Sequence, residues 1–444
     1  MDAHQPIDVD ILILGAGMSG LTAARALAER GLRVLILEAR DRIGGRVWSQ
    51  RAPSGDIVEL GAEFIHGRVP ELFSLIDESG VTIAERDGIM LRESSDGGIH
   101  QDDNATEAMF APLENLEDYE GEDLSFADWL NASDVREDGR AAVTAYVEGF
   151  NAADATKISI KSLGFQQKAE DETEGYRSWH VHGGYVQLVE YLAARVTAQQ
   201  GRIELDCIVE SIAWQQGAVE VTTSKGTFRA PRCLVTLPLG VLQQVNRAGG
   251  ISMQPAPAAI AQAHRMEMGH AARVTLVFRS RWWESTSVAP GEELQQMGFL
   301  LTRDRLPSVW WTARNESKPA PTLTGWSGGP RSLIFSGRTT DELAAEACTT
   351  LAKIFQVDEA LVRSELLSAH THDWTADSFS RGAYSYVAAG GMDAPHAMTL
   401  PEQDTLFFAG EHTDITGHWG TVHAAIRSGL RAAEQILSTQ SQEL

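Results

Sequence analysis

The hydrophobic pattern near the start of the chain alternates strand-length apolar runs with a longer helical segment. Residues 11–14 form an unbroken apolar run, and residues 33–37 form a second. Between them, residues 21–30 are rich in Ala and Leu, which favour a helix. Two apolar strands joined by a helix predict a parallel βαβ unit with buried strands.

Further along the chain the pattern changes character. Residues 71–179 interleave apolar positions with many Asp and Glu, which predicts helices and loops of a separate domain with an acidic face. This acidic face is either simply solvated or guides a polyamine. The predicted strands that follow cover residues 203–211, 218–223, 227–230, 234–237, 273–278 and 405–409. The predicted helices cover residues 186–197, residues 340–355 after a Thr-Thr-Asp cap signal, and residues 420–436.

The turn after the first strand carries glycines in G-x-G-x-x-G spacing. Gly15 permits a tight turn, Gly17 lets the backbone approach a pyrophosphate, and Gly20 lets the helix pack against the strand. The helix N-terminus adds free N–H groups for the phosphates. Glu38 follows the second strand, where an acid binds the adenosine ribose hydroxyls and disfavours NADP. Together these features predict a dinucleotide site.

Two further loops carry candidate chemistry. A glycine pair, Gly44 and Gly45, lies between Arg42 and Arg46 and suits a second passage of backbone beside the same phosphates, with either arginine near the anion. Without Glu38 just before it, this glycine pair would predict only a surface turn. The loop at residues 61–67 carries Glu63 and His66 and is placed to reach a cofactor ring. For these two side chains, hydrogen bonding to other site residues is favoured over a direct catalytic role.

Composition narrows the class of protein. The 444 residues carry a formal net charge of −24, which argues against nucleic acid or anionic membrane as partners. The three cysteines show neither metal-ligand spacing nor a disulfide framework, so no metal is expected. No apolar stretch has the length of a transmembrane helix, and no leader segment precedes the first strand. We therefore expect a cytoplasmic setting. The sequence does not determine the oligomeric state, and a homodimer is one of the alternatives.

Several motifs spread along the chain resemble the flavin-containing amine oxidase family, which includes monoamine oxidases, polyamine oxidases and lysine-specific histone demethylases. They are the glycine turn with Glu38, R-I-G-G-R at residues 42–46, E-L-G-A at 59–62, T-L-P-L-G-V-L at 236–242, W-x-x-D at 374–377, R-G-x-Y-S-Y-V-A-A-G at 381–390, F-F-A-G-E-H-T at 407–413 and T-V-H-x-A at 421–425. Their order and spacing agree over nearly the whole length. The resemblance implies FAD rather than NAD.

The resemblance also implies the fold. We expect an α/β protein with a Rossmann-like FAD-binding domain of the amine oxidase type and a second, mixed α+β substrate domain. The FAD-binding domain is expected to be discontinuous, and so is the substrate-binding domain. Their segments are residues 1–70, 180–245 and 377–444 for FAD, and residues 71–179 and 246–376 for the substrate.

The same resemblance assigns the cofactor contacts. Val209 falls where the family places a valine whose backbone meets the adenine, Glu411 where the ribityl chain is bound, and Thr421 and Val422 at the helix end that faces the isoalloxazine. The full predicted set is Gly15, Gly17, Ser19, Gly20, Glu38, Arg40, Gly45, Arg46, Gly61, Ala62, Glu63, Val209, Gly410, Glu411, Thr421 and Val422.

Three positions depart from the family pattern. Ala383 stands where monoamine oxidases attach FAD through a cysteine, so the flavin is expected to be non-covalent. The first aromatic of the substrate cage is present as Tyr384, but the second falls on Thr421, as in the demethylase branch. Arg273 stands where the family has a lysine that holds a water near the flavin. Since arginine does not readily lose its proton, this puts oxygen reactivity in question.

The resemblance implies oxidation of a small amine at the carbon bearing nitrogen, with FAD accepting a hydride equivalent and O₂ or another acceptor reoxidising the flavin to complete the cycle. The predicted catalytic residues are Tyr384, which orients the amine, Arg273, which holds water or a substrate carboxylate, and Thr421. Two alternatives remain open: a flavin dehydrogenase or desaturase with another electron acceptor, and a non-catalytic flavin-binding protein. The identity of the amine is not readable.

Overall fold

The computed structural model describes residues 9–114, 116–313 and 319–440. Its first sheet confirms the predicted parallel βαβ core and has the order β10-β2-β1-β14-β23, with every neighbouring pair parallel. These strands are β1 Ile11–Leu14, β2 Val34–Leu37, β10 Arg202–Glu204, β14 Arg232–Val235 and β23 Leu406–Phe408. The middle strands consist of fully buried residues, as their unbroken apolar runs predict.

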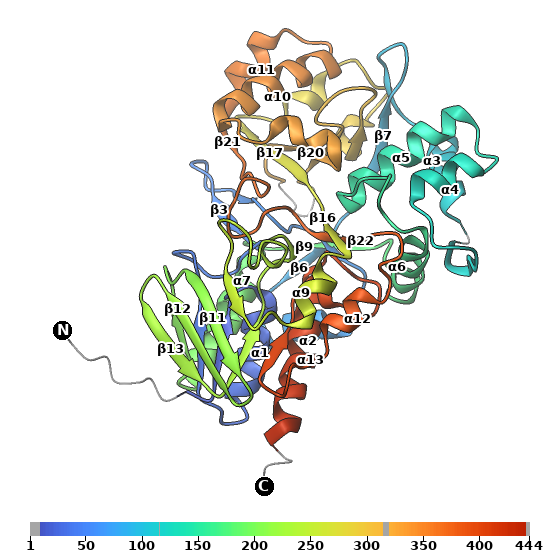
Figure 1. Cartoon of the computed structure of the whole chain (residues 1–444). Helices are drawn as coiled ribbons and strands as arrows, with labels where there is room; N and C mark the ends of the chain where they lie inside the picture. The colour runs from blue at the N-terminus through green and yellow to red at the C-terminus, as the bar shows by residue number, and fades with distance from the viewer. Residues whose placement is uncertain (1–8, 115, 314–318, 441–444) are drawn as a thin grey trace.

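Two layers cover this sheet, in the lower part of Figure 1. One face packs against three helices, which are α1 Met18–Ala28, α7 Val186–Ala198 and α13 Val422–Gln440. The other face packs against a second sheet of order β13-β12-β11-β15, whose strands are β11 Val209–Gln215, β12 Ala218–Thr223, β13 Gly226–Ala230 and β15 Ser252–Gln254. This layering is the expected Rossmann-like domain.

The single strand predicted over residues 203–211 is wrong, because a turn divides it into β10 and β11. Asp206 adopts a left-handed conformation, with φ of 50°. The Asp206 N–H donates to the Arg40 carbonyl, and the Cys207 N–H donates to the Glu38 carbonyl. The turn therefore lies against the loop that follows β2 and brings Val209 next to it.

The upper part of Figure 1 holds a mixed seven-stranded sheet of order β21-β17-β20-β19-β18-β7-β8. Its strands are β7 Ile89–Glu93, β8 Ile99–Gln101, β17 Ala271–Phe278, β18 Met297–Leu301, β19 Val309–Thr312, β20 Thr322–Gly328 and β21 Leu366–His370. One face packs against α10 Thr340–Ile354 and α11 Glu359–Glu365. Helix α10 begins at a capping box between Thr339 and Glu342, which confirms the predicted cap.

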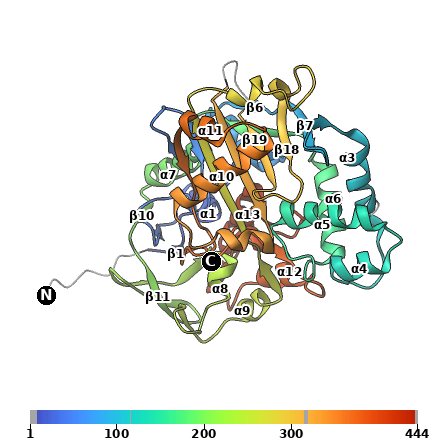
Figure 2. The same ribbon diagram turned by 90° about the horizontal axis from the view of Figure 1, so that it is seen from above.

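A group of helices lies beside this sheet, at the right in Figures 1 and 2. It consists of α3 Asp103–Phe110, α4 Phe126–Ala132, α5 Glu137–Asn151 and α6 Ile160–Glu172. These are the helices predicted for the acidic segment. Their apolar residues form a separate core, which includes Phe126, Val143, Val147 and Leu163.

The hydrophobic cores place two predicted domain boundaries differently. Helix α2, Pro70–Ser79, contributes Leu72, Leu75 and Ile76 to the core of the first sheet. Residues 253–268, with helix α9 Ala258–Ala263, belong to the core between the first and second sheets. The divisions predicted at residues 70 and 245 therefore cut through continuous packing. Both segments of the first domain extend further along the chain.

Candidate functional site

The three glycines after β1 have different structural roles. A Cβ on Gly20 would lie 2.1 Å from the Gly15 carbonyl oxygen, so Gly20 allows α1 to start directly against the end of β1. Gly15 itself has φ of 106°, in the region that favours glycine. A Cβ on Gly17 would meet nothing within 4 Å. The open space is therefore at Gly17, where the pyrophosphate was predicted. Gly20, predicted as a cofactor contact, lies outside the cavity lining and shapes the turn instead.

Glu38 lies at the carboxyl end of β2, beside this turn. One carboxylate oxygen accepts from the Ala16 N–H at 2.7 Å, and the other accepts from the Arg40 N–H at 3.0 Å. The residue is only 4% exposed, yet it lines the central cavity. The backbone thus fixes the carboxylate at the position predicted for ribose binding.

The arginines of the second glycine loop are held by partners from the C-terminal part of the chain. Arg40 pairs with Asp377 at 2.7 Å, and Arg46 pairs with Glu411 at 2.9 Å. Both line the cavity. Arg42 does not: its guanidinium lies over the Trp48 ring, 4.1 Å from the centroid. Of the two arginines predicted near the anion, the structure places Arg46 at the cavity wall.

Glu411 connects three segments of the site. One of its oxygens binds Arg46, and the other accepts from Ser385 Oγ at 2.5 Å and from the Gly420 N–H at 2.9 Å. Burial raises the pKa of this carboxyl, but Arg46 and the hydrogen bonds outweigh burial, and the net pKa is lowered. The carboxylate is thus ionised, and protein donors occupy both oxygens. Its side chain secures the glycine loop and the start of α13.

One continuous cavity of about 1720 Å³ runs from the glycine turn into the second domain. Apart from Gly20, all predicted cofactor-binding and catalytic residues line it. They are Gly15, Gly17, Ser19, Glu38, Arg40, Gly45, Arg46, Gly61, Ala62, Glu63, Val209, Arg273, Tyr384, Gly410, Glu411, Thr421 and Val422. Fold topology therefore gathers motifs from nearly the whole chain into one site.

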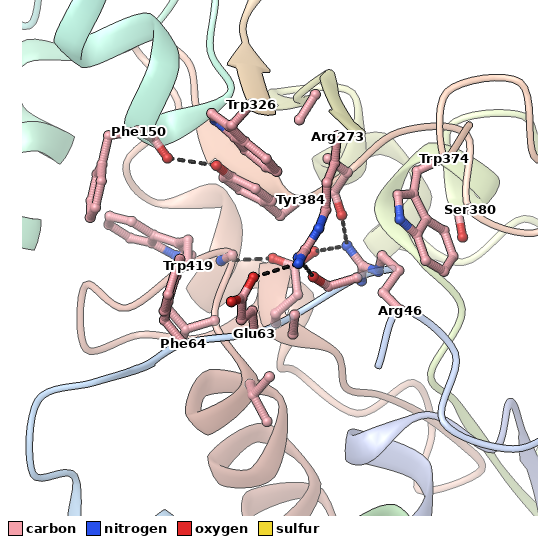
Figure 3. Close-up of a pocket in the computed structure, with 18 of the residues that line it drawn as sticks. Arg46, Glu63, Phe64, Phe150, Arg273, Trp326, Trp374, Ser380, Tyr384 and Trp419 are labelled. Atoms are coloured by element: carbon pink, nitrogen blue, oxygen red, sulfur yellow. Dashed lines mark hydrogen bonds and ion pairs between the residues drawn. The ribbon is translucent and has the colours of Figure 1, made fainter. Parts of the chain in front are cut away.

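Part of this cavity is an aromatic chamber, shown in Figure 3. Tyr384 donates its hydroxyl to the Phe150 carbonyl at 2.6 Å, and its ring lies nearly parallel to Trp326, with centroids 6.5 Å apart. Trp326 donates to the Gly149 carbonyl at 3.0 Å. Both rings are thus tied to the end of α5. Burial raises the pKa of Tyr384 well above its usual range.

One face of the seven-stranded sheet forms the wall of this chamber. Arg273 on β17 and Trp326 on β20 are direct cross-strand neighbours, and Phe299 on β18 is paired with Trp311 on β19. All four line the cavity. Alternate residues such as Val274 and Trp310 point into the core beneath α10. The sequence analysis placed the tryptophans in the core or in a cavity wall, but did not identify the face.

Arg273 is held by two residues of the loop after the strand Ile57–Glu59. It is 7% exposed, and its Nη2 lies 2.5 Å from Glu63 Oε2 while its Nη1 donates to the Gly61 carbonyl at 3.0 Å. Trp311 Nε1 also donates to Glu63, at 3.2 Å. Glu63 thus balances the charge of Arg273, and the role predicted for Arg273, holding water or a substrate carboxylate, stays a prediction. Glu63 was predicted as a cofactor contact, with hydrogen bonding to other site residues favoured over catalysis, and its carboxylate holds Arg273.

Thr421 is the residue before α13. Its Oγ1 accepts from the Ala424 N–H at 3.1 Å, as an N-cap does, and donates to the His418 carbonyl at 2.7 Å. The hydroxyl is therefore committed to the helix end. The N-terminus of α13, with its partial positive charge, faces the cavity at Thr421 and Val422.

A dinucleotide cradle joined to an aromatic chamber suits an oxidoreductase with a bound dinucleotide cofactor. The profile of the flavin containing amine oxidoreductase family matches residues 18–437, and the chain belongs to this family. The predicted FAD cofactor is thereby confirmed, and the residues fit it: Gly17 leaves the open space and Glu38 the fixed acid that the adenosine diphosphate needs.

Known proteins agree with this assignment. Human lysine-specific histone demethylase 2 is 25% identical over 453 residues, which cover 96% of this chain and 53% of the demethylase. The chain thus spans about half the length of the demethylases it matches. A pseudooxynicotine dehydrogenase from a Pseudomonas species is 23% identical, and the match covers 97% of this chain and 87% of that protein. The structure of wild-type putrescine oxidase bound to putrescine superposes with a TM-score of 0.81, at 21% identity, over 98% of this chain and all of that one. This likeness shows the two-domain fold.

In the part of the chain that the structure describes, there is neither a helix able to span a membrane nor a cluster of residues able to hold a metal ion.

Proposed function

We propose that this protein is an FAD-dependent amine oxidase that oxidises a C–N bond of a small amine to an imine. The imine hydrolyses to an aldehyde or ketone plus ammonia or a smaller amine, and O₂ is reduced to H₂O₂. The observation that carries the proposal is the single cavity that joins the dinucleotide cradle to the aromatic chamber. Bound FAD would supply the two-electron acceptor for the C–H bond next to nitrogen.

The chamber suits a neutral amine. Its walls include the rings of Phe64, Phe150, Trp311, Trp326 and Tyr384, which exclude water and disfavour an unpaired ammonium group. The Tyr384 hydroxyl is donated to a backbone carbonyl and has a raised pKa, so this residue offers its ring and accepts no proton. We assign Tyr384 to orienting the amine beside Trp326.

The remaining polar groups supply a fixed electric field. The N-terminus of α13 stabilises negative charge at the adjoining cavity wall. The positive charge of Arg273 is balanced by Glu63 across 2.5 Å. Neither group exchanges protons with the substrate, which agrees with oxidation of an amine that enters the chamber uncharged.

Anaerobic reduction of the purified holoprotein tests the proposal. Mixing with monoamines, polyamines and amino acids should bleach the oxidised flavin band with at least one class. Readmitting air should then restore the band and release one H₂O₂ per amine oxidised. Absence of bleaching with every amine, in protein that holds FAD, would contradict the proposal and favour a non-catalytic flavin-binding protein.

A second candidate is a flavin dehydrogenase or desaturase that passes electrons to an acceptor other than O₂. It is favoured by Arg273 at the position where the family has a lysine, and one relative is named a dehydrogenase. The peroxide yield per turnover separates the two, because a dehydrogenase would be reduced by its substrate but reoxidised slowly in air. The cytoplasmic setting and the absence of nucleic-acid and membrane partners remain predictions, and the oligomeric state stays open, with a homodimer among the alternatives.

A further inference from the structure

The cavity extends beyond the aromatic chamber along one side of α5. Phe150 and Tyr146 lie one helical turn apart, and their rings stack with centroids 5.6 Å apart at an angle of 14°. Phe110 meets the Tyr146 ring edge-on at 4.6 Å. All three residues line the cavity. They form an apolar wall that leads away from the Phe150 carbonyl, to which Tyr384 is bound.

Glu170 on α6 lies at the far end of this wall. It lines the same cavity, and its charge acts on the Tyr146 hydroxyl. One carboxylate oxygen accepts from Gln166 Nε2 at 2.8 Å. Within the described residues, no arginine or lysine pairs with this carboxylate. By contrast, Glu63, Glu93 and Glu411 in the same lining are each paired with an arginine.

The surroundings make this carboxylate unusual. Burial raises the pKa of Glu170 to about 6, and the neighbouring Asp171 acts in the same direction. Above that pH the group is a negative charge on a half-buried side chain that lines the cavity, with no arginine or lysine pairing with it among the described residues. A partly desolvated charge of this kind is stabilised by an opposite charge that enters with a ligand.

We propose that Glu170 is a binding site for a second, cationic group of the substrate. The inference rests on the proposed function. The reacting amine would occupy the chamber beside Tyr384 and Trp326, and an ammonium group at the other end of the same molecule would pair with Glu170. The Phe150 and Tyr146 rings would cover the apolar methylene groups that connect the two nitrogen atoms. The substrate class is thus an amine with two separated nitrogen atoms.

Paired substrates test this site directly. Anaerobic flavin reduction is followed at pH 8 with α,ω-diaminoalkanes and with 1-aminoalkanes of equal chain length, in the wild-type holoprotein, Glu170→Gln and Glu172→Gln. Glu172 is an exposed residue of the same helix, so its variant removes an equal charge outside the cavity. The wild type should reach half-maximal reduction at a diamine concentration at least about tenfold lower than for the matched monoamine, as a charge-assisted pair predicts.

In Glu170→Gln this preference should disappear, while the limiting rate of flavin reduction and the monoamine response stay unchanged. Glu172→Gln should behave as wild type. A wild type without diamine preference, or a Glu170→Gln variant that keeps it, overturns the proposal. FAD content and circular dichroism show whether each variant is folded, and Glu170→Asp, which keeps the charge, should retain part of the preference.

A binding measurement separates this proposal from the proposed function. If no amine reduces the flavin, the proposed function fails. Titration of the oxidised holoprotein with the same diamines and monoamines, followed by the flavin absorbance spectrum, then decides about the site. Tighter diamine binding that depends on Glu170 supports the site without the reaction, and equal binding in wild type and Glu170→Gln overturns it.

Discussion

Arg273 on β17 and Glu63 on the loop after β4 form a buried ion pair, with Nη2 2.5 Å from Oε2, at the wall of the aromatic chamber. The two residues are separated by 210 positions in the sequence. The Gly61 carbonyl and Trp311 Nε1 complete the set of hydrogen bonds. The pair joins the two domains at the cavity and keeps a positive charge fixed where the family has a titratable lysine.

Removing one member of this pair should destabilise the protein more than removing both. Arg273→Met leaves Glu63 charged and buried, and we expect a loss of about 3–5 kcal/mol in the free energy of unfolding. The double variant Arg273→Met/Glu63→Gln should recover most of that loss, because no unpaired charge remains. Urea denaturation of the holoproteins measures both. Equal stability of the single and double variants would show that the pair does not act as a unit.

The glycine turn predicts opposite effects for two similar substitutions. In Gly20→Ala the new Cβ would lie 2.1 Å from the Gly15 carbonyl oxygen, so folding of the first domain should fail. In Gly17→Ala the Cβ meets no protein atom within 4 Å, so the apoprotein should fold normally. Its FAD affinity should nevertheless fall by about tenfold or more, because the methyl group occupies space needed by the pyrophosphate. Circular dichroism and FAD titration distinguish the two outcomes, and normal FAD affinity in Gly17→Ala would place the phosphates elsewhere.

Glu38 should contribute to FAD binding through its charge. In Glu38→Gln the amide oxygen still accepts from one backbone N–H, but the amide NH₂ group faces the other N–H and cannot accept from it. The variant also loses the charge-assisted hydrogen bonds to the ribose. We expect FAD affinity to fall by roughly 10- to 1,000-fold, corresponding to about 1.4–4 kcal/mol. Quenching of FAD fluorescence during titration of the apoprotein measures this change. Glu220→Gln on β12 is a suitable control, because the Glu220 carboxylate pairs with Arg229 outside the cavity lining, and this variant should bind FAD as wild type does.

The flavin should be released intact when the holoprotein is precipitated with acid. Ala383 lines the cavity where monoamine oxidases carry the attaching cysteine, and it cannot form a covalent bond to FAD. The yellow colour is therefore expected in the supernatant, with the mass of free FAD. Colour that stays with the precipitated chain would point to attachment at another residue that lines the cavity.

His412 should make the protein less stable in acid. Burial lowers its pKa to about 4 from an ordinary value of 6.5, and its ring nitrogens have no partner within the described structure. The unfolded chain therefore binds a proton below about pH 6.5 that the folded chain does not. The stability this histidine contributes is complete above pH 6.5 and falls as the pH drops toward 4, by up to about 3 kcal/mol.

Replacing His412 with Leu should reduce that dependence on pH. The variant should lose less stability than the wild type between pH 7 and pH 5 in urea denaturation. The exposed His396→Gln variant should keep the wild-type slope. An unchanged slope in His412→Leu would mean that other buried histidines, such as His66 and His180, account for the acid sensitivity.

Local sequence determined much of this protein. Residues 11–38 predicted the strands, the helix, the glycine turn and the acid, because each depends on contacts within a few residues of the chain. The parallel pairing of β1 with β2 follows from the same local elements, whereas β10, β14 and β23 join the sheet from distant parts of the chain. The division of residues 203–211 was missed, because the turn at Asp206 is fixed by hydrogen bonds to Glu38 and Arg40, far away in the sequence.

The tertiary structure determined which partners each side chain of the site binds. The sequence by itself predicted a dinucleotide cradle, and its resemblance to the family predicted that Arg273 replaces a lysine and that Tyr384 belongs to the substrate end. Only the folded chain showed that Glu63 pairs with Arg273, that Trp326 is the neighbour of Arg273 on the adjacent strand, and that no arginine or lysine among the described residues pairs with Glu170. Charge pairing and burial arise between residues hundreds of positions apart, and no local pattern of the chain records them.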